Sequence, residues 1–190
     1  MTPPKFILSL NLPNIITVAR ILLTPLFLIF LEQKRYGSAL MIVFAAAVSD
    51  GLDGFLARYF NQRTELGAYL DPLADKLLLN TAFVGMAVLG LLPVWLAVTV
   101  ISRDVFILLG VAIFFITGTA LKVDPSILSK TTTFTQLTTV CLTLLSLSLV
   151  PVPDWILNFC YGATIFFTIA SGGHYLIVGL RQLQKNNDQP

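Results

Sequence analysis

The sequence predicts an all-α integral membrane protein with six transmembrane helices, and three observations lead to that fold class. The chain of 190 residues is 56% hydrophobic and 12% charged, whereas soluble domains carry roughly 25% charged residues. Six apolar segments are each long enough to cross a bilayer, which takes about 20 residues of helix. Short breaks rich in polar residues or proline separate these segments, so consecutive helices should pack antiparallel. The net charge of +2 gives no indication of nucleic-acid binding.

The six predicted helices cover residues 14–31, 36–60, 65–92, 93–118, 127–150 and 154–183. They form one six-helix transmembrane domain, residues 14–183. Residues 1–13 are too short to span a bilayer and are expected to lie on the membrane as an interfacial arm. Residues 184–190 are polar and are expected to form a C-terminal tail.

Lysine and arginine in the short connections predict the orientation, because cytoplasmic loops are enriched in them. With both termini in the cytoplasm, the inside holds seven of these residues and the outside holds only Lys34 and Arg35. The seven are Lys5, Arg58, Arg63, Lys122, Lys130, Arg181 and Lys185. This topology places the turn at residues 61–64 on the cytoplasmic side.

Four aspartates flank that turn. Asp50 and Asp53 are three residues apart on the second predicted helix, and Asp71 and Asp75 are four apart on the third, so each pair shares a helix face. A carboxylate at membrane depth costs about 2.5 to 3.5 kcal/mol on insertion scales. Carboxylate oxygens suit Mg²⁺, Mn²⁺ or Ca²⁺. If the two faces oppose each other, the four groups can hold two divalent ions.

Small residues and one arginine accompany the aspartates. Gly54, Ala57 and Gly67 bare the backbone, which permits close approach of either a neighbouring helix or a ligand. Gly54 and Ala57 share the face of Asp50 and Asp53, where contact with a ligand is at least as plausible as packing. Arg58 can pair with an acidic group or a phosphate.

These residues form the pattern D-x2-D-G-x2-A-R-x8-G-x3-D-x3-D, which starts at Asp50 and ends at Asp75. The pattern closely resembles the signature of the CDP-alcohol phosphatidyltransferases, and the likeness extends from Leu12 to Tyr175. It implies that family's fold, with six spans, a homodimer and two divalent cations, Mg²⁺ or Mn²⁺, in a cleft open to the cytoplasm. It also implies a multi-pass protein of the bacterial inner membrane that transfers the phosphatidyl group of CDP-diacylglycerol to an alcohol and releases CMP.

The resemblance also assigns roles to individual residues. Asp50, Asp53 and Asp71 would be metal ligands, and Asp75 would be both a ligand and the general base. The remaining signature residues would bind CDP-diacylglycerol: Gly54, Ala57, Arg58 and Gly67.

The acceptor alcohol depends on residues outside the signature. Arg103 and Lys130 are candidates for binding it; alternatively, Arg103 ties helices together through an ion pair and Lys130 is an interfacial anchor. Phosphatidylglycerophosphate synthases typically carry S-R-E and a second arginine eight residues after the first, where this chain has Asp104 and Val111. The segments around Arg103 and Lys130 are more similar to the CMP-forming cardiolipin synthases. The sequence therefore favours phosphatidylglycerol as acceptor, with glycerol 3-phosphate as the alternative.

Two other classes of membrane protein use acidic motifs. Prenyl transferases carry two motifs far apart in sequence, and cation transporters scatter their acids over several helices, often with internal repeats. The compact spacing between Asp50 and Asp75, and a sequence without an evident repeat, argue against both classes.

Overall fold

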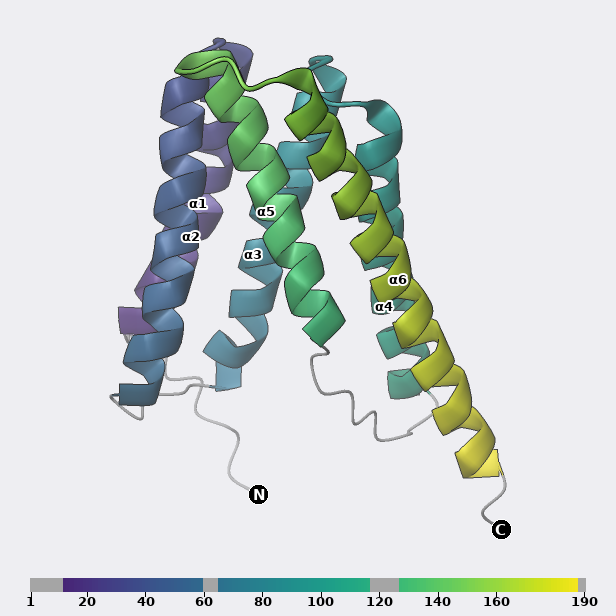
Figure 1. The fold of residues 1–190 in the computed structure, drawn as a ribbon. Helices are drawn as coiled ribbons and strands as arrows, with labels where there is room; N and C mark the ends of the chain where they lie inside the picture. The colour runs from purple at the N-terminus through teal and green to yellow at the C-terminus, as the bar shows by residue number, and fades with distance from the viewer. Residues whose placement is uncertain (1–11, 60–64, 117–126, 188–190) are drawn as a thin grey trace. The chain divides into compact units, whose positions relative to one another are not determined.

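The chain is built from α-helices in the computed structural model (Figure 1), which describes residues 12–59, 65–116 and 127–187. Side chains are described at residues 21–49, 76–110, 112 and 127–179. The described ranges contain six helices and no strand: α1 (Leu12–Glu32), α2 (Tyr36–Tyr59), α3 (Glu65–Val88), α4 (Val94–Ile116), α5 (Ile127–Ser148) and α6 (Asp154–Asn187). The prediction of an all-α chain of six helices is confirmed over these ranges.

The helix ends differ from the predicted ones by a few residues. α1 begins at Leu12, so Leu12 and Pro13 belong to the helix; the rest of the predicted interfacial arm, residues 1–11, lies outside the described residues. Proline is tolerated in a first turn because its missing N–H has no partner there. α6 continues to Asn187, four residues beyond the predicted end, so the polar tail starts later than expected.

Two helix ends share one hydrogen-bond pattern. At the end of α1, the Arg35 N–H donates to the Phe30 carbonyl at 2.9 Å, and Lys34 adopts φ 58°. At the end of α3, the Leu91 N–H donates to the Met86 carbonyl at 2.8 Å, and Gly90 adopts φ 70°. A left-handed residue after the last turn lets these bonds satisfy the final carbonyls. Gly90 therefore ends α3 before the apolar run 89–92 that the sequence assigned to the helix.

The chain divides into two compact units, Met1–Thr81 and Ala82–Pro190, with the boundary inside α3. In the first unit α1 packs against α2. α1 buries Phe27 and Leu31, one turn apart, and α2 buries a stripe at helical spacing that consists of Ala39, Ile42, Val43 and Ala46. This packing fixes the helix that carries the first half of the acidic pattern.

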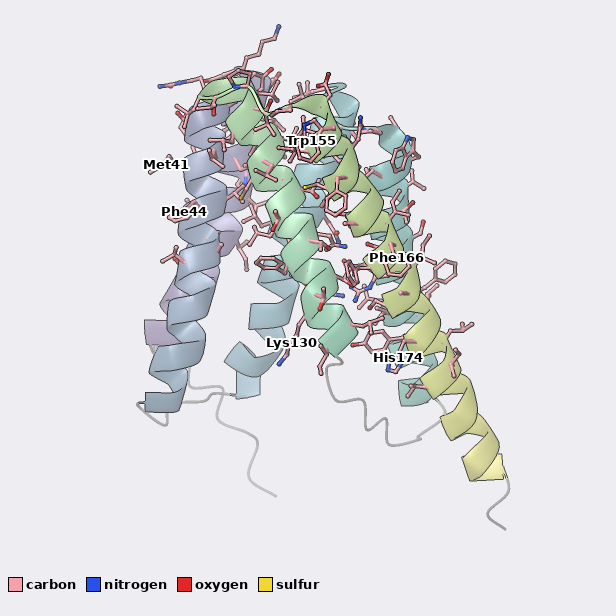
Figure 2. The ribbon with its side chains drawn as sticks, viewed as in Figure 1. Met41, Phe44, Lys130, Trp155, Phe166 and His174 are labelled. Carbon is pink, nitrogen blue, oxygen red and sulfur yellow. The ribbon has the colours of Figure 1, made fainter. Side chains whose placement is uncertain are left out.

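In the second unit α6 packs against both α4 and α5. The buried face of α4 changes character along its length, from Leu96, Ala97 and Val100 to the charged pair Arg103 and Asp104. The buried faces of α5 and α6 are largely polar, while their outer faces carry large apolar side chains. Trp155 and Phe166, for example, are 72% and 66% exposed, and the Phe166 ring projects outward from α6 (Figure 2).

The stretch Asp154–Gly179 of α6 spans 26 residues and is long and apolar enough to cross a membrane. It is the one helix that meets this criterion among the residues with described side chains. Shorter apolar helical stretches of 10–17 residues lie at Ile21–Glu32, Tyr36–Ser49 and Lys76–Val88.

Candidate functional site

The acidic pattern lies on two helices of the first unit. α2 carries Asp50 and Asp53 in its C-terminal half, and α3 carries Asp71 and Asp75 in its N-terminal half. Both stretches are helical, so the predicted spacing holds, and the members of each pair lie within about one turn of each other. The side chains of these aspartates lie outside the described residues, and so does the turn at 61–64.

The four remaining signature residues are also helical. Gly54, Ala57 and Arg58 belong to the last turns of α2, and Gly67 belongs to the first turn of α3. Their side chains are likewise outside the described set, so their contacts with CDP-diacylglycerol stay a prediction.

The donor set of the acidic pattern fits hard divalent cations. Asp50, Asp53, Asp71 and Asp75 supply carboxylate oxygens, the ligands that Mg²⁺ and Mn²⁺ prefer. No group of three or more His, Cys, Asp or Glu residues with metal-binding geometry occurs among the side chains that the structure does describe. Enzymes with this signature generally depend on divalent cations.

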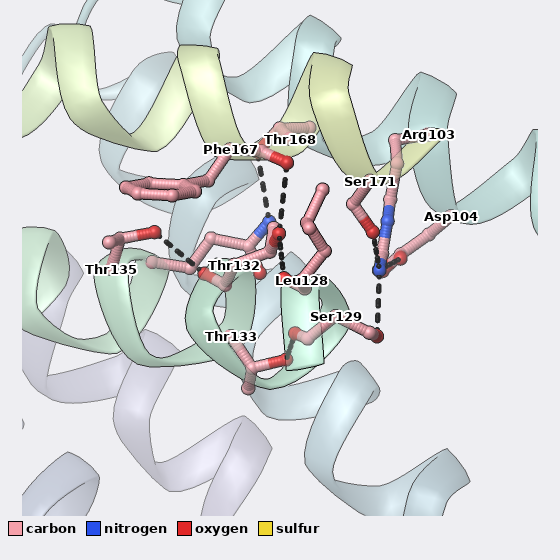
Figure 3. A network of polar contacts seen from close by, with 11 residues as sticks. Arg103, Asp104, Leu128, Ser129, Thr132, Thr133, Thr135, Phe167, Thr168 and Ser171 are labelled. Carbon is pink, nitrogen blue, oxygen red and sulfur yellow. Dashed lines mark hydrogen bonds and ion pairs between the residues drawn. The ribbon is translucent and has the colours of Figure 1, made fainter. Parts of the chain in front are cut away.

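A second cluster of polar groups surrounds Arg103 of α4 (Figure 3). Its side chain is 5% exposed, and Nη1 donates to Oδ1 of the neighbouring Asp104 at 2.6 Å. Nη2 donates to Ser129 Oγ of α5 at 3.0 Å and to Ser171 Oγ of α6 at 2.9 Å. The ion pair thus lies within α4, and the serine hydroxyl groups connect the arginine to the two other helices. We call Arg103, Asp104, Ser129 and Ser171 the arginine cluster.

One donor of the arginine cluster has no partner. Nε of Arg103 is the one buried side-chain nitrogen or oxygen without a hydrogen bond among the described side chains. The guanidinium lies over the Tyr175 ring, with Cζ of Arg103 6.0 Å from the ring centroid. A Cβ at Gly172 would lie 3.6 Å from Arg103 Cγ, an ordinary contact, so the backbone of α6 passes close to the arginine stem.

A row of hydroxyl and amide groups runs from the arginine cluster along the α5–α6 interface. Thr132 Oγ1 donates to the Phe167 carbonyl at 3.0 Å, and Thr139 and Thr164 share a bond of 2.8 Å between their hydroxyl groups. Weaker contacts of 3.4 and 3.5 Å join Gln136 to Thr168 and Thr143 to Tyr161. We call these residues the polar seam: Thr132, Gln136, Thr139, Thr143, Tyr161, Thr164 and Thr168.

Lys130 and His174 lie toward the same end of the second unit (Figure 2), and along the chain they are one and three residues from Ser129 and Ser171 of the arginine cluster. Lys130 is exposed in the first turn of α5, next to Ser129. His174 is exposed on α6, and its ring meets that of Tyr175 edge to face at 6.2 Å.

The sequence pointed to Arg103 but missed two of its partners. Ser129 and Ser171 lie 26 and 68 residues from it along the chain, and neither follows a motif that marks an arginine ligand. The sequence nevertheless contains a pattern that could have predicted a polar contact between α5 and α6. Hydroxyl and amide residues recur every three or four positions through residues 129–143 of α5 and 161–171 of α6, which marks a polar face on each helix.

Comparisons with known proteins agree with the signature. The sequence model of the CDP-alcohol phosphatidyltransferase family matches residues 10–170. A CDP-diacylglycerol–glycerol-3-phosphate 3-phosphatidyltransferase of Bacillus subtilis is 32% identical, over 93% of this chain and 99% of its own length. An Aquifex aeolicus protein of the same name is 38% identical, over 76% of this chain and 79% of its own.

A human cardiolipin synthase (CMP-forming) is also similar, with 30% identity over 98% of this chain and 67% of its own length. The relatives therefore carry two names that differ in the acceptor. The family match covers both units of the structure, including every residue of the acidic pattern and Arg103. The chain belongs to the CDP-alcohol phosphatidyltransferase family and is an enzyme of phospholipid synthesis.

Proposed function

We propose that this enzyme transfers the phosphatidyl group of CDP-diacylglycerol to a hydroxyl group of phosphatidylglycerol, which yields cardiolipin and CMP. The acceptor oxygen forms a bond to the phosphatidyl phosphorus, and the bond from that phosphorus to the CMP oxygen breaks. Asp75 takes the hydroxyl proton as general base. Gly54, Ala57, Arg58 and Gly67 hold the CDP-linked head group.

Asp50, Asp53, Asp71 and Asp75 are the residues that would hold two divalent cations, Mg²⁺ or Mn²⁺. When bound, the cations neutralise the diphosphate and stabilise the charge of the leaving CMP. The support is the donor chemistry of four carboxylates on two consecutive helices, at spacings that the helical backbone preserves. Without cations, four carboxylates near one another in a medium of low dielectric constant would repel.

The observation that carries the choice of acceptor is the pairing of Arg103 with Asp104 at 2.6 Å. Arg103 is the only lysine or arginine between residues 94 and 116, and Val111 stands where a second arginine is typical of enzymes that use glycerol 3-phosphate. A single arginine with a carboxylate beside it suits the singly charged phosphodiester of phosphatidylglycerol. Lys130, exposed at the start of α5, is a further group for the acceptor head group.

Glycerol 3-phosphate is the second candidate acceptor, and one comparison favours it. The Bacillus subtilis relative, whose name states that acceptor, matches nearly the whole chain and nearly its own whole length. The human cardiolipin synthase covers more of this chain but only 67% of the relative.

We further propose that the enzyme is a homodimer in a bacterial inner membrane, with six spans, both termini in the cytoplasm and the acidic cleft open to the cytoplasm. Residues 14–183 form its catalytic domain, with an interfacial arm before it and a short tail after it. The support is the arrangement of α5 and α6, which bury hydroxyl groups and expose apolar side chains. Buried polar contacts with an apolar exterior are typical of helices packed in lipid.

One assay tests the activity and the acceptor together. The purified chain receives CDP-diacylglycerol, Mg²⁺ or Mn²⁺, and either phosphatidylglycerol or glycerol 3-phosphate, and released CMP and the lipid product are quantified. We expect cardiolipin from phosphatidylglycerol and no CMP release after chelation. Product from glycerol 3-phosphate alone would overturn the acceptor, and undiminished CMP release without divalent cations would overturn the metal site.

A further inference from the structure

The arginine cluster limits which donors Arg103 can offer to a ligand. A guanidinium carries five N–H donors, one on Nε and two on each Nη. Nη2 donates to both Ser129 Oγ and Ser171 Oγ, at 3.0 and 2.9 Å, so both of its protons are used. Nη1 donates to Asp104 Oδ1 at 2.6 Å. Each terminal nitrogen is therefore already bound to the protein.

Because these donors are already used, Arg103 lacks a free pair of adjacent N–H groups, which is what an arginine needs to bind two oxygens of a terminal phosphate. A guanidinium binds two oxygens of one phosphate through adjacent N–H groups, either on Nε and the neighbouring Nη or on the two Nη atoms. Each of these two arrangements needs a free Nη proton that is parallel to the N–H group beside it. The serines take both protons of Nη2, and the carboxylate of Asp104 holds Nη1.

The remaining feature is a single buried donor. Nε of Arg103 has no hydrogen-bond partner in the part of the chain whose side chains are described, and the residue is 6% exposed. A buried donor without an acceptor costs roughly 1–3 kcal/mol, so a ligand oxygen at Nε would relieve that cost. One donor can satisfy one oxygen, and the adjacent carboxylate of Asp104 disfavours a second negative charge on the ligand.

We propose that Ser129, Ser171 and Asp104 are specificity-determining positioning residues, which hold the guanidinium of Arg103 so that it binds one oxygen of a singly charged phosphodiester and rejects a doubly charged terminal phosphate. This inference rests on the proposed function, because it explains the preference for phosphatidylglycerol over glycerol 3-phosphate. It assigns roles to a hydroxyl group of α5 and one of α6.

The test is to free the N–H donors of Arg103 by removing the serine hydroxyl groups, and to measure which acceptor the enzyme then prefers. The double variant S129A/S171A frees both Nη2 protons and restores such a pair of adjacent N–H groups at Nε. With CDP-diacylglycerol saturating, we expect the ratio of kcat/KM for glycerol 3-phosphate to that for phosphatidylglycerol to rise by about tenfold, which is the lower end of what one hydrogen bond to a charged group supplies. The change should lie mainly in KM, because the serines act on acceptor binding.

Two control variants separate this effect from a disturbed helix interface. Ser129→Thr keeps the hydroxyl group and should keep the wild-type ratio. Gly172→Ala adds a methyl group 3.6 Å from the arginine stem without releasing a donor, so it should also keep the ratio. If the double variant does not fold, the single variants Ser129→Ala and Ser171→Ala each free one proton, and at least one should shift the ratio.

A binding measurement without turnover gives a second readout. Glycerol 3-phosphate, added without CDP-diacylglycerol, should raise the thermal stability of S129A/S171A more than that of the wild type. An active variant with an unchanged ratio would refute the inference and leave the proposed function standing. A wild-type enzyme that prefers glycerol 3-phosphate would instead refute the proposed acceptor.

Discussion

Replacing Thr139 and Thr164 by valine, singly and together, tests whether the polar seam holds α5 against α6. The two hydroxyl groups share a 2.8 Å hydrogen bond, and the residues are 1% and 0% exposed. Valine has nearly the shape of threonine, so each change removes a hydroxyl group with little change in volume. Thr164 also donates to the Thr135 carbonyl at 3.2 Å, which gives it a second partner when Thr139 is changed.

The expected cost follows from the lipid environment proposed above. Lipid tails are as apolar as valine, so the added methyl group gains no free energy of burial from the exchange. Thr139→Val loses the bond between the two hydroxyl groups, and Thr164→Val loses that bond and the longer one to the Thr135 carbonyl. An interhelical hydrogen bond averages about 0.6 kcal/mol in a membrane protein and reaches about 1.7. Each single variant should therefore lose about 1 kcal/mol of unfolding free energy, toward the upper half of that range because the bond is short and fully buried. The double variant should lose less than the sum, because the same bond is counted in both singles.

The assay is reversible unfolding in mixed micelles, with the free energy of unfolding measured for the wild type, both singles and the double variant. Thr133→Val is the matched control, because Thr133 is exposed on α5 and its hydroxyl donates to the Ser129 carbonyl of its own helix. The control should change stability by less than about 0.5 kcal/mol, as is usual for surface positions. Strictly additive losses, with no coupling between Thr139 and Thr164, would refute the seam as the contact that joins the helices.

Three further predictions address other parts of the chain. Asp71→Asn should abolish CMP release and weaken Mn²⁺ binding, measured by titration calorimetry, while circular dichroism stays that of the wild type; normal turnover would contradict the metal site. Lys34→Gly should raise the free energy of unfolding by about 1 kcal/mol, because a left-handed backbone costs a non-glycine residue about that much. Gly90→Ala should lower the free energy of unfolding by about the same amount in the same assay, because Gly90 adopts φ 70° and the space around it is open. Asp104→Asn leaves the buried charge of Arg103 without its carboxylate, so it should lower the unfolding free energy by about 3–5 kcal/mol, with partial recovery in phosphate buffer; an unchanged stability would contradict the ion pair.

The sequence predicted the helices well because two independent signals mark them. Apolar runs of membrane-spanning length define the helix bodies, and proline, glycine or polar residues interrupt the runs at the ends. The clearest difference is at α3, where the apolar run continues through Leu91 and Leu92 although the helix ends at Val88. Hydropathy cannot register this end, because it depends on the backbone angle that Gly90 adopts.

The two parts of the candidate site differ in how far the sequence could predict them. The acidic pattern is local, since all four aspartates fall within 26 residues on two consecutive helices, and helical spacing alone pairs Asp50 with Asp53 and Asp71 with Asp75. Whether the four side chains converge stays a prediction. The arginine cluster joins three helices, and the partners of Arg103 follow from how α4 and α5 pack on α6, which no spacing along the chain encodes.

The arginine cluster and the acidic pattern of this apolar chain differ in their balance of positive and negative charge. The arginine cluster is electrically balanced, because the guanidinium of Arg103 and the carboxylate of Asp104 are in contact and both are at least nine-tenths buried. In the acidic pattern, four aspartates outnumber Arg58, the one basic residue of the signature. A paired charge costs less to bury than an unpaired one and attracts a highly charged ligand less, whereas carboxylates without counter-charges need cations. This difference in charge agrees with the proposal that the acidic pattern binds the diphosphate of the donor through cations and that the arginine cluster binds the less charged acceptor.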